Sequence, residues 1–284
     1  MTPPSSLLQE ICACFGQPVA GNPTQYMIEK AFAHHGLEWR YLTLEVASDD
    51  LADAVRGMRA MGFRGGNITK PHKVAVVGLL DRLSEAAATM GAVNCIVRED
   101  RELLGENTDG KGFMQSLRGL TDPAGKRVVL LGAGGAARAI GIELGLAGAA
   151  GISIVNRTAE RGEDLAQLIT AKTQTEAAHV LWEGDFAVPG DVAIVINATS
   201  IGMGDAAARV PVDFSGAAKN IVAADVVVNP PDTRFLAAAR EHGATTLDGL
   251  GMIVNQAAIA FQLWTGIEPD TQVMRDAVEE FLGV

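Results

Sequence analysis

The sequence predicts an α/β protein built from two α/β domains. Strand-like and helix-like runs alternate along most of the 284 residues, which favours βαβ units and mostly parallel sheets. In the second half the strand-like runs are continuously apolar, as expected of strands that are covered on both faces. A glycine-rich turn at 132–138 stands between a strand pattern and a helix pattern, which is typical of a Rossmann-type nucleotide-binding domain.

The elements expected in the first hundred residues follow from their apolar periodicity. Strands are expected at residues 11–16, 39–44 and 65–68, and a strand pair at 92–98 and 102–104 with its turn at 99–100. Helices are expected at residues 26–35 and 51–61, the second ended by Gly62.

A second unit begins after the turn-rich segment 121–125, which follows an expected helix at 112–120. Its expected strands are 127–131, 151–155, 192–196 and 221–225, and its helices are 135–146 and 159–170. Two further helices, 249–264 and 271–282, exceed what a nucleotide domain needs, so we expect them to pack onto the first domain. The predicted domains are therefore residues 1–108 with 244–284, and residues 109–243 as the Rossmann NAD(P)-binding domain.

Composition narrows the function classes. A formal charge of −11 argues against nucleic acid or an anionic membrane as a partner, because both need a basic surface. No apolar run reaches the roughly 18–20 residues of a membrane span, and residues 1–6 lack the basic start of a secretion signal. Cys12, Cys14 and Cys95 form no disulfide framework and no metal-ligand pattern. We expect a cytoplasmic protein without a metal.

The glycine loop predicts dinucleotide binding. Gly132 permits the tight turn, Gly134 lets the backbone approach a pyrophosphate, and Ala137 lets the helix pack closely on the sheet. The free N–H groups at the start of the helix then face the phosphates.

The residues after the next strand favour NADP over NAD. An NAD-selective site carries an acidic residue about 20 positions beyond the glycines. Here that position is Asn156, followed by Arg157, Thr158 and Arg161. Two guanidinium groups and a hydroxyl can hold a 2′-phosphate, whereas a carboxylate would repel it. The alternative is that the arginines only solvate a helix start, and NAD stays open as a second cofactor.

Two polar loops supply candidate groups for proton transfer, at residues 66–73 and 105–110. Hydride delivery to a ketone leaves negative charge on its oxygen, which needs a proton donor. Lys73 can supply that proton, and Asp109 can hold the lysine and bind a neighbouring hydroxyl. Thr69 and Asn94, together with Asn67, are uncharged groups able to bind other hydroxyls. The alternative for Lys73 is a solvated surface lysine.

The chain resembles the shikimate dehydrogenase family over nearly its whole length. The matching segments are residues 67–73, 91–94, 107–110, 132–137, 156–158, 197–203 and 248–252. The resemblance implies an N-terminal substrate domain, completed by C-terminal helices, and a Rossmann domain, with the active site in the cleft between them. It also implies reduction of 3-dehydroshikimate to shikimate with NADPH, or a related reaction such as oxidation of quinate.

The resemblance also implies roles for individual residues. Lys73 and Asp109 match the catalytic pair, and Met203, Gly251 and Met252 are expected near the nicotinamide. The substrate would be bound by Asn22, Thr24, Thr69, Asn94 and Gln256. The cofactor would be bound by Gly132, Ala133, Gly134, Gly135, Ala136, Asn156, Arg157, Thr158, Arg161, Thr199, Met203, Val226, Gly249 and Met252.

The chain departs from the family pattern on one side of the expected pocket. The family holds the substrate carboxylate with a Ser-x-Ser motif, where this chain has Asn22 and Thr24. A tyrosine expected after a late strand is replaced by Val228. The catalytic side keeps the family pattern. The substrate therefore stays open among shikimate, quinate, an amino analogue and another polyhydroxy ring carboxylate.

The predicted function is that of an NADP-dependent shikimate dehydrogenase-like oxidoreductase of the EC 1.1.1 class, as in aromatic amino acid biosynthesis. One alternative is a quinate/shikimate or aminoshikimate dehydrogenase that uses NAD or NADP. Another is a nucleotide-sensing regulator without turnover, which Lys73 and Asp109 argue against. The expected assembly is a monomer or homodimer.

Overall fold

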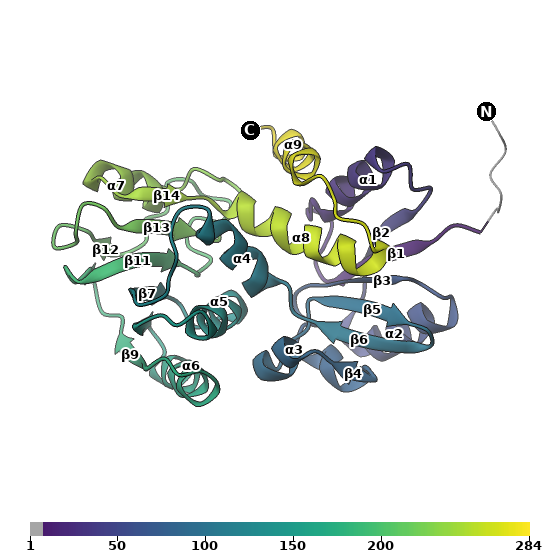
Figure 1. The fold of residues 1–284 in the computed structure, drawn as a ribbon, viewed down its shortest axis with the longest axis horizontal. Coiled ribbons are helices and arrows are strands. Elements are labelled where there is room, and N and C mark those ends of the chain that lie inside the picture. The colour runs from purple at the N-terminus through teal and green to yellow at the C-terminus, as the bar shows by residue number, and fades with distance from the viewer. Residues whose placement is uncertain (1–7) are drawn as a thin grey trace. The chain divides into compact units, whose positions relative to one another are not determined.

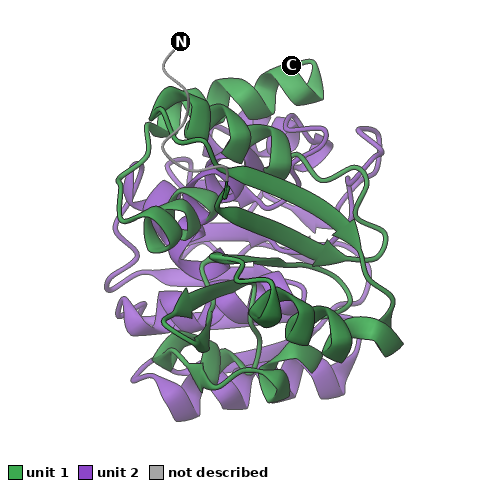
Figure 2. Cartoon of the chain, turned by 90° about the vertical axis from the view of Figure 1, so that its right-hand side faces the viewer, with its two compact units in different colours: residues 1–108, 257–284 green, residues 109–256 purple. Residues whose placement is uncertain are grey.

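The chain forms two compact units in the computed structural model, which describes residues 8–284 (Figure 1). Unit 1 comprises Met1–Thr108 and Ala257–Val284, and unit 2 comprises Asp109–Gln256; they are green and purple in Figure 2. The segment 1–6, interpreted above as lacking a secretion signal, lies outside the described residues. None of the helices in the described part of the chain is long and apolar enough to span a membrane.

The chain passes between the two compact units at two points. The units divide after Thr108, where the sequence also placed a boundary. The second division falls after Gln256 and not before Ala244. The reason is a short strand, β14 (Thr245–Leu247), which pairs in parallel with β13 (Val222–Asp225) and so extends the sheet of unit 2.

Unit 1 contains a six-stranded mixed sheet in the order β2-β1-β3-β5-β6-β4. Strand β1 is parallel to β2 and β3, whereas β5 is antiparallel to both β3 and β6. The strand bounds are β1 (Ile11–Gly16), β2 (Arg40–Glu45), β3 (Gly65–Ile68), β4 (Arg82–Leu83), β5 (Cys95–Glu99) and β6 (Glu102–Glu106). The helices are α1 (Thr24–His34), α2 (Leu51–Ala60), α3 (Glu85–Met90) and α9 (Thr271–Leu282), with 3₁₀ turns η1 (Ser48–Asp50) and η2 (Ala75–Leu79).

The apolar faces of these elements explain the packing of unit 1. Phe15 of β1, Met58 of α2 and Ile96 of β5 meet in one buried cluster. Helix α1 packs against α9, as the sequence predicted for the last helix, and Lys30 pairs with Glu280 across them at 3.2 Å.

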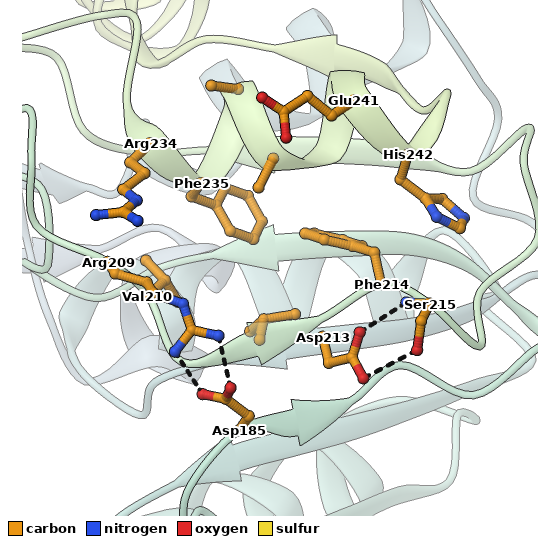
Figure 3. A pocket seen from close by; sticks show the side chains of 13 residues that line it. Asp185, Arg209, Val210, Asp213, Phe214, Ser215, Arg234, Phe235, Glu241 and His242 are labelled. Atoms are coloured by element: carbon orange, nitrogen blue, oxygen red, sulfur yellow. Dashed lines mark hydrogen bonds and ion pairs between the residues drawn. The ribbon is translucent and has the colours of Figure 1, made fainter.

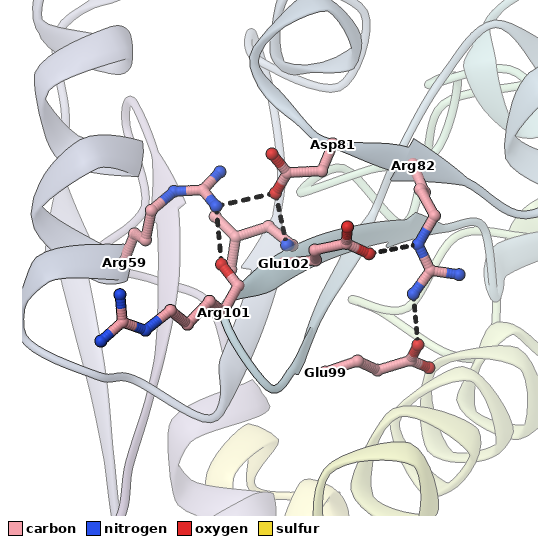
Figure 4. Close-up of polar contacts among 7 residues, drawn as sticks. Arg59, Asp81, Arg82, Glu99, Arg101 and Glu102 are labelled. Atoms are coloured by element: carbon pink, nitrogen blue, oxygen red, sulfur yellow. Dashed lines mark hydrogen bonds and ion pairs between the residues drawn. The ribbon is translucent and has the colours of Figure 1, made fainter.

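The outer edge of this sheet is covered by charged side chains (Figure 4). Arg82 pairs with Glu99 at 2.5 Å and with Glu102 at 2.7 Å. Asp81 pairs with Arg59 at 2.8 Å and accepts the Leu103 N–H at 2.7 Å; Arg59 and this N–H hold the pKa of Asp81 below its usual range. Exposed ion pairs contribute little stability, but charge on an edge strand disfavours pairing with another chain.

Unit 2 is a parallel six-stranded sheet in the order β14-β13-β11-β7-β8-β9. Counted along the chain this is 6-5-4-1-2-3, the order of a Rossmann domain. The remaining strands are β7 (Arg127–Leu131), β8 (Gly151–Asn156), β9 (Ala177–Leu181) and β11 (Val192–Asn197), with a separate pair β10 (Phe186–Ala187) and β12 (Val212–Asp213). The helices are α4 (Asp109–Arg118), α5 (Gly135–Leu146), α6 (Ala159–Lys172) and α7 (Arg234–His242). Helix α8 (Gly249–Thr265) belongs to unit 2 up to Gln256 and to unit 1 from Ala257.

The buried strands of unit 2 carry the apolar runs that predicted them. Val129, Ile154 and Ile194 are fully buried, so these parallel strands are covered on both faces. The two-domain α/β architecture is confirmed. One local expectation is wrong: Asp109 does not lie within a loop but is the first residue of α4.

Candidate active site

The loop that carries Lys73 is held at several points within unit 1. The His72 N–H donates to the Thr69 carbonyl at 2.9 Å, and His72 Nε2 lies 2.8 Å from the Val46 carbonyl oxygen. The carbonyl of Lys73 accepts the N–H of Val93 at 2.8 Å. The Lys73 side chain is half-buried at the end of this turn. The fold therefore fixes the backbone on which the lysine stands.

The loop that leads to Asp109 is held by Asn94, the residue that follows Val93. Asn94 Oδ1 accepts the Thr108 N–H at 2.7 Å, and Asn94 Nδ2 donates to Thr108 Oγ1 at 3.0 Å. Both groups are buried. Val93 and Asn94 thus anchor Lys73 on one side and Thr108, the neighbour of Asp109, on the other. These two polar loops, far apart in sequence, are brought to one place.

A buried tyrosine supports this anchor, and the sequence did not identify it. Tyr41 of β2 donates from its hydroxyl to Asn67 Oδ1 at 2.6 Å, and Asn67 Nδ2 donates to the Asn94 carbonyl at 3.3 Å. Tyr41 is completely buried and Asn67 nearly so. The amide of Asn67 is therefore used within the protein, which argues for a supporting role. The bond joins residues 26 positions apart, which no local pattern reveals.

The loop between β1 and α1 and the first residue of α1 present uncharged groups at the two positions where the family motif has serines. Asn22 Oδ1 accepts the Thr24 N–H at 2.9 Å, and its Nδ2 contacts Cys14 Sγ at 3.8 Å. Thr24 is 4% exposed. On the same loop the Val19 N–H donates to the carboxylate of Glu45 at 3.2 Å. Neither Asn22 nor Thr24 supplies a positive charge to neutralise an anion.

The thiol of Cys14 is neutral in this setting. Burial raises its pKa to about 11, although Tyr41 and the charge of Lys73 act in the opposite direction. The lysine charge therefore acts on the same polar region as Asn22.

The remaining predicted substrate residues lie in different places. Thr69 lies in the Lys73 loop of unit 1, against the backbone of Gly16, where a Cβ would come within 2.3 Å of the threonine methyl group. Gln256 lies in unit 2 on α8, 7% exposed, with its Nε2 donating to the Ile253 carbonyl at 3.0 Å. Val228 follows β13, also in unit 2.

The glycine loop after β7 leaves room for a phosphate group. Gly132 has φ +100°, and its N–H donates to the Val155 carbonyl at 2.8 Å. A Cβ on Gly134 or Gly135 would meet no atom of residues 8–284 within 4 Å. The packing of the protein itself therefore does not require these glycines. Ala133 and Ala136 complete the turn into α5, whose free N–H groups suit a pyrophosphate.

The turn after β8 carries two exposed arginines. Asn156 Nδ2 donates to the Thr158 carbonyl at 2.8 Å and so shapes the turn. Arg157 and Arg161 are exposed, and neither forms an ion pair with any described residue. Two exposed guanidinium groups without an ion-pair partner in the described chain are suited to binding a 2′-phosphate.

The other predicted cofactor residues follow the carboxyl ends of β11 and β13 or begin α8. Thr199 Oγ1 donates to Asn197 Oδ1 at 2.7 Å, and the Val226 N–H donates to the Asn197 carbonyl at 3.0 Å. Gly249 has no room for a Cβ, which would lie 2.3 Å from the Val227 oxygen. Met203 is 53% exposed, and Met252 is half-buried on α8. The β7–β11 neighbourhood is the switch point at which such sheets bind ligands.

A buried carboxylate ties the ends of β11 and β13 together, and the sequence did not identify it. Asp225 accepts hydrogen bonds from Asn197 Nδ2 at 3.0 Å, from the Val227 N–H at 3.0 Å and from Thr233 Oγ1 at 2.7 Å. Burial raises the pKa of Asp225, while these donors oppose the shift. The carboxylate is a structural support for the loops that carry Thr199 and Val226.

A pocket of about 660 Å³ in unit 2 contains none of the predicted site residues (Figure 3). It lies between the β10–β12 pair and α7 and is floored by Phe214 and Phe235. Its rim includes Arg209, which pairs with Asp185 at 2.6 Å. Among the described residues, no cluster of three His, Cys, Asp or Glu side chains could hold a metal ion.

Comparisons with known proteins place these motifs in one family. Residues 14–96 match the shikimate dehydrogenase substrate binding domain, residues 116–200 match shikimate / quinate 5-dehydrogenase, and residues 249–279 match the shikimate 5′-dehydrogenase C-terminal domain. A shikimate dehydrogenase (NADP(+)) of Moorella thermoacetica is 42% identical over 277 residues, which cover 96% of this chain and 94% of the relative.

Two solved structures are similar over nearly the whole chain. The ligand-free 5-ketofructose reductase of Gluconobacter sp. strain CHM43 is 49% identical, with a TM-score of 0.94 and coverage of 97% of this chain and 99% of that one. The shikimate 5-dehydrogenase of Thermus thermophilus, in complex with NADP(H) and shikimate, is 33% identical, with a TM-score of 0.85 and coverage of 96% and 100%. The chain therefore belongs to the shikimate dehydrogenase family.

Proposed function

We propose that this chain catalyses reversible, NADP-dependent hydride transfer between a secondary alcohol and a ketone, with Lys73 and Asp109 handling the proton. The chain is an NADP-dependent oxidoreductase of the shikimate dehydrogenase family, and interconversion of 3-dehydroshikimate and shikimate is the reaction of its curated relatives. The observation that carries the proposal is the shared anchor at Val93 and Asn94, which holds the backbone of both polar loops.

The reaction adds one hydride to the keto carbon and one proton to its oxygen. NADPH, when bound by the glycine loop, supplies the hydride. The Lys73 ammonium donates the proton as negative charge grows on the oxygen, and in the reverse direction it takes the proton back. Asp109 would hold the lysine in place and accept a hydrogen bond from a neighbouring substrate hydroxyl. Asn94 keeps the backbone before Asp109 in place through its two bonds to Thr108.

The cofactor site is proposed from the unit 2 loops. Gly132, Ala133, Gly134, Gly135 and Ala136 would hold the pyrophosphate. The 2′-phosphate would be held by Asn156, Arg157, Thr158 and Arg161, and the nicotinamide end by Thr199, Met203, Val226, Gly249 and Met252. The absence of an acidic side chain at Asn156 supports NADP as the preferred cofactor.

A second candidate substrate is an uncharged polyhydroxy ketone such as 5-ketofructose. The observation that favours it is the replacement of the two family serines by Asn22 and Thr24, where the Asn22 side chain already accepts the Thr24 N–H. Val228 adds no hydroxyl on that side. The similarity at 49% identity to a 5-ketofructose reductase supports the same substrate class. A neutral sugar ketone needs hydrogen-bonding groups at this end of the pocket, and it needs no site that binds a substrate carboxylate.

A substrate panel tests the proposal and separates the two candidates. NADPH consumption, followed by its absorbance, would be measured with 3-dehydroshikimate and 5-ketofructose, and the reverse reaction with shikimate, quinate and aminoshikimate. Turnover of any of these compounds supports the oxidoreductase proposal, and the ratio of kcat/KM values identifies the substrate class. Absence of turnover with all of them, combined with intact NADPH binding, would favour a nucleotide sensor.

The partners and location are proposed on the same basis. The substrate would be a small polyhydroxy molecule, and neither nucleic acid nor a membrane is proposed as a partner, because the net charge is −11. We place the enzyme in the cytoplasm as a monomer or homodimer.

A further inference from the structure

The imidazole of His179 lies against the carboxyl end of β8, from which the expected cofactor turn begins. His179 is in the middle of β9, in register with Ile154 of β8. Its Nε2 lies 3.1 Å from the carbonyl oxygen of Asn156. A carbonyl oxygen only accepts, so Nε2 carries the hydrogen and donates it. The same oxygen accepts the backbone N–H of Trp182 at 3.2 Å and is therefore held by two donors.

Helix α6 packs closely on this ring because Gly162 has no side chain. A Cβ on Gly162 would lie 2.1 Å from Cδ2 and 2.7 Å from Nε2 of His179. Any other residue at position 162 would have to displace the ring or the helix. The imidazole is therefore fixed both by its hydrogen bond and by packing against α6.

The turn between Asn156 and Gly162, the two residues that His179 contacts, carries Arg157 and Arg161. The Asn156 side chain donates to the Thr158 carbonyl at 2.8 Å, and the Gly162 N–H donates to the same carbonyl at 3.2 Å. Asn156 and Thr158 are thus both fixed, with Arg157 between them. Arg161 directly precedes Gly162 on the first turn of α6. The ring of His179 contacts both backbone segments on which these guanidinium groups stand.

We infer that His179 is a positioning residue for recognition of the cofactor 2′-phosphate. The inference rests on the proposed function and deepens its cofactor site. His179 does not touch the phosphate; it fixes Asn156 and the start of α6, so that Arg157 and Arg161 converge on one anion. Without this hydrogen bond both arginines keep their positive charge, but the backbone that carries them is less well fixed. The two side chains then bind one phosphate together less effectively.

The test compares His179→Phe with His179→Gln in the full-length protein. Phenylalanine keeps a ring against Gly162 without the donor, whereas glutamine keeps an N–H donor. Affinities for NADPH and NADH would be measured by fluorescence titration, and kcat at saturating NADPH by absorbance. We expect His179→Phe to weaken NADPH about tenfold and NADH less than about twofold, with kcat nearly unchanged. We expect His179→Gln to recover most of the NADPH affinity.

Two further variants make the result decisive. Gly162→Ala displaces the unaltered ring and should produce the same selective loss of NADPH affinity, even if His179→Phe does not fold. His242→Phe is the matched control, because His242 Nε2 also lies 3.1 Å from a carbonyl oxygen, that of Ala217, in the same unit. It should leave both affinities unchanged.

Specific outcomes would overturn the inference. Equal weakening of NADPH and NADH, or no effect in either the His179 or the Gly162 variant, contradicts a role in 2′-phosphate recognition. If Arg157→Ala discriminates between the cofactors while the His179 and Gly162 variants do not, the inference fails and the cofactor proposal stands. If wild-type protein binds both cofactors equally, the proposed NADP site fails as well.

Discussion

Asn94 and Thr108 are joined by two hydrogen bonds, one from the Thr108 N–H to Asn94 Oδ1 at 2.7 Å and one from Asn94 Nδ2 to Thr108 Oγ1 at 3.0 Å. The residue before Asn94 donates its N–H to the Lys73 carbonyl at 2.8 Å. The backbones next to the two residues proposed to handle the proton, Lys73 and Asp109, are thus held by neighbouring residues of one buried segment. This arrangement predicts that activity depends on a side chain that need not itself take part in the chemistry.

Asn94→Ala should lower kcat by about ten- to a hundredfold, because small displacements of a catalytic group are costly. Steady-state kinetics with the preferred substrate measures the change in kcat. Thr108→Ser keeps both bonds and is the matched control, with activity expected within about twofold of wild type. A rise in KM with unchanged kcat would show that Asn94 acts in substrate binding alone.

Arg157→Ala should weaken NADPH by about ten- to a hundredfold and leave NADH nearly unaffected, since a charge-assisted hydrogen bond to the 2′-phosphate is lost. Fluorescence titration with both cofactors measures the two affinities. Arg118→Ala, another exposed arginine of unit 2, controls for net charge. Equal weakening of NADPH and NADH would show that Arg157 does not bind the 2′-phosphate.

The thiol of Cys14 should make stability fall as the pH rises through the alkaline range. Its pKa is about 11 in the folded protein against 9.0 as the ordinary value, because of burial. Between these values the unfolded chain loses this proton and the folded chain keeps it, so the free energy of unfolding decreases as pH rises from 9 to 11. The expected loss is about 2–3 kcal/mol.

Urea unfolding of wild type and Cys14→Ser at pH 8 to 10.5 measures this decrease in the free energy of unfolding. Within that pH range the expected decrease for the wild type is on the order of 1–2 kcal/mol. Serine does not titrate there, so the two stability curves should converge as the pH rises. Parallel curves would show that Cys14 keeps an ordinary pKa in the folded state.

Asp225→Ala should destabilise the protein by about 3 kcal/mol, because the Asn197 amide and the Thr233 hydroxyl lose a buried acceptor. Urea unfolding measures the change. Asp213→Ala is the control, since Asp213 is exposed and its carboxylate accepts hydrogen bonds only from Ser215 among the described residues. A change below about 1 kcal/mol for Asp225→Ala would show that the carboxylate does not support these strands.

The sequence predicted the elements whose signals are local. Strand β1 and helix α5 have the predicted bounds, because apolar runs and the glycine turn define them. Helix α7 was not predicted, since its buried face consists of only Phe235, Leu236 and Ala239. The predicted boundary at Ala244 differs from the division of the compact units after Gln256, because the three residues of β14 carry too weak a strand pattern to show which sheet they join.

The candidate site shows the same limit. Lys73 and the glycine loop stand in compact motifs, so spacing alone points to them. Tyr41 and His179 act through bonds to residues 26 and 23 positions away. Such contacts depend on strand order and register, which a single sequence does not specify.

The most direct test of the central claim is the rate of hydride transfer in Lys73→Ala, measured in single turnover with saturating NADPH and the preferred substrate. Lys70→Ala is the control, because Lys70 is an exposed lysine of the same loop. We predict a loss on the order of a hundredfold or more for Lys73→Ala, unchanged NADPH affinity, and near-normal activity for Lys70→Ala. A Lys73→Ala enzyme that turns over at the wild-type rate would contradict the role assigned to this lysine.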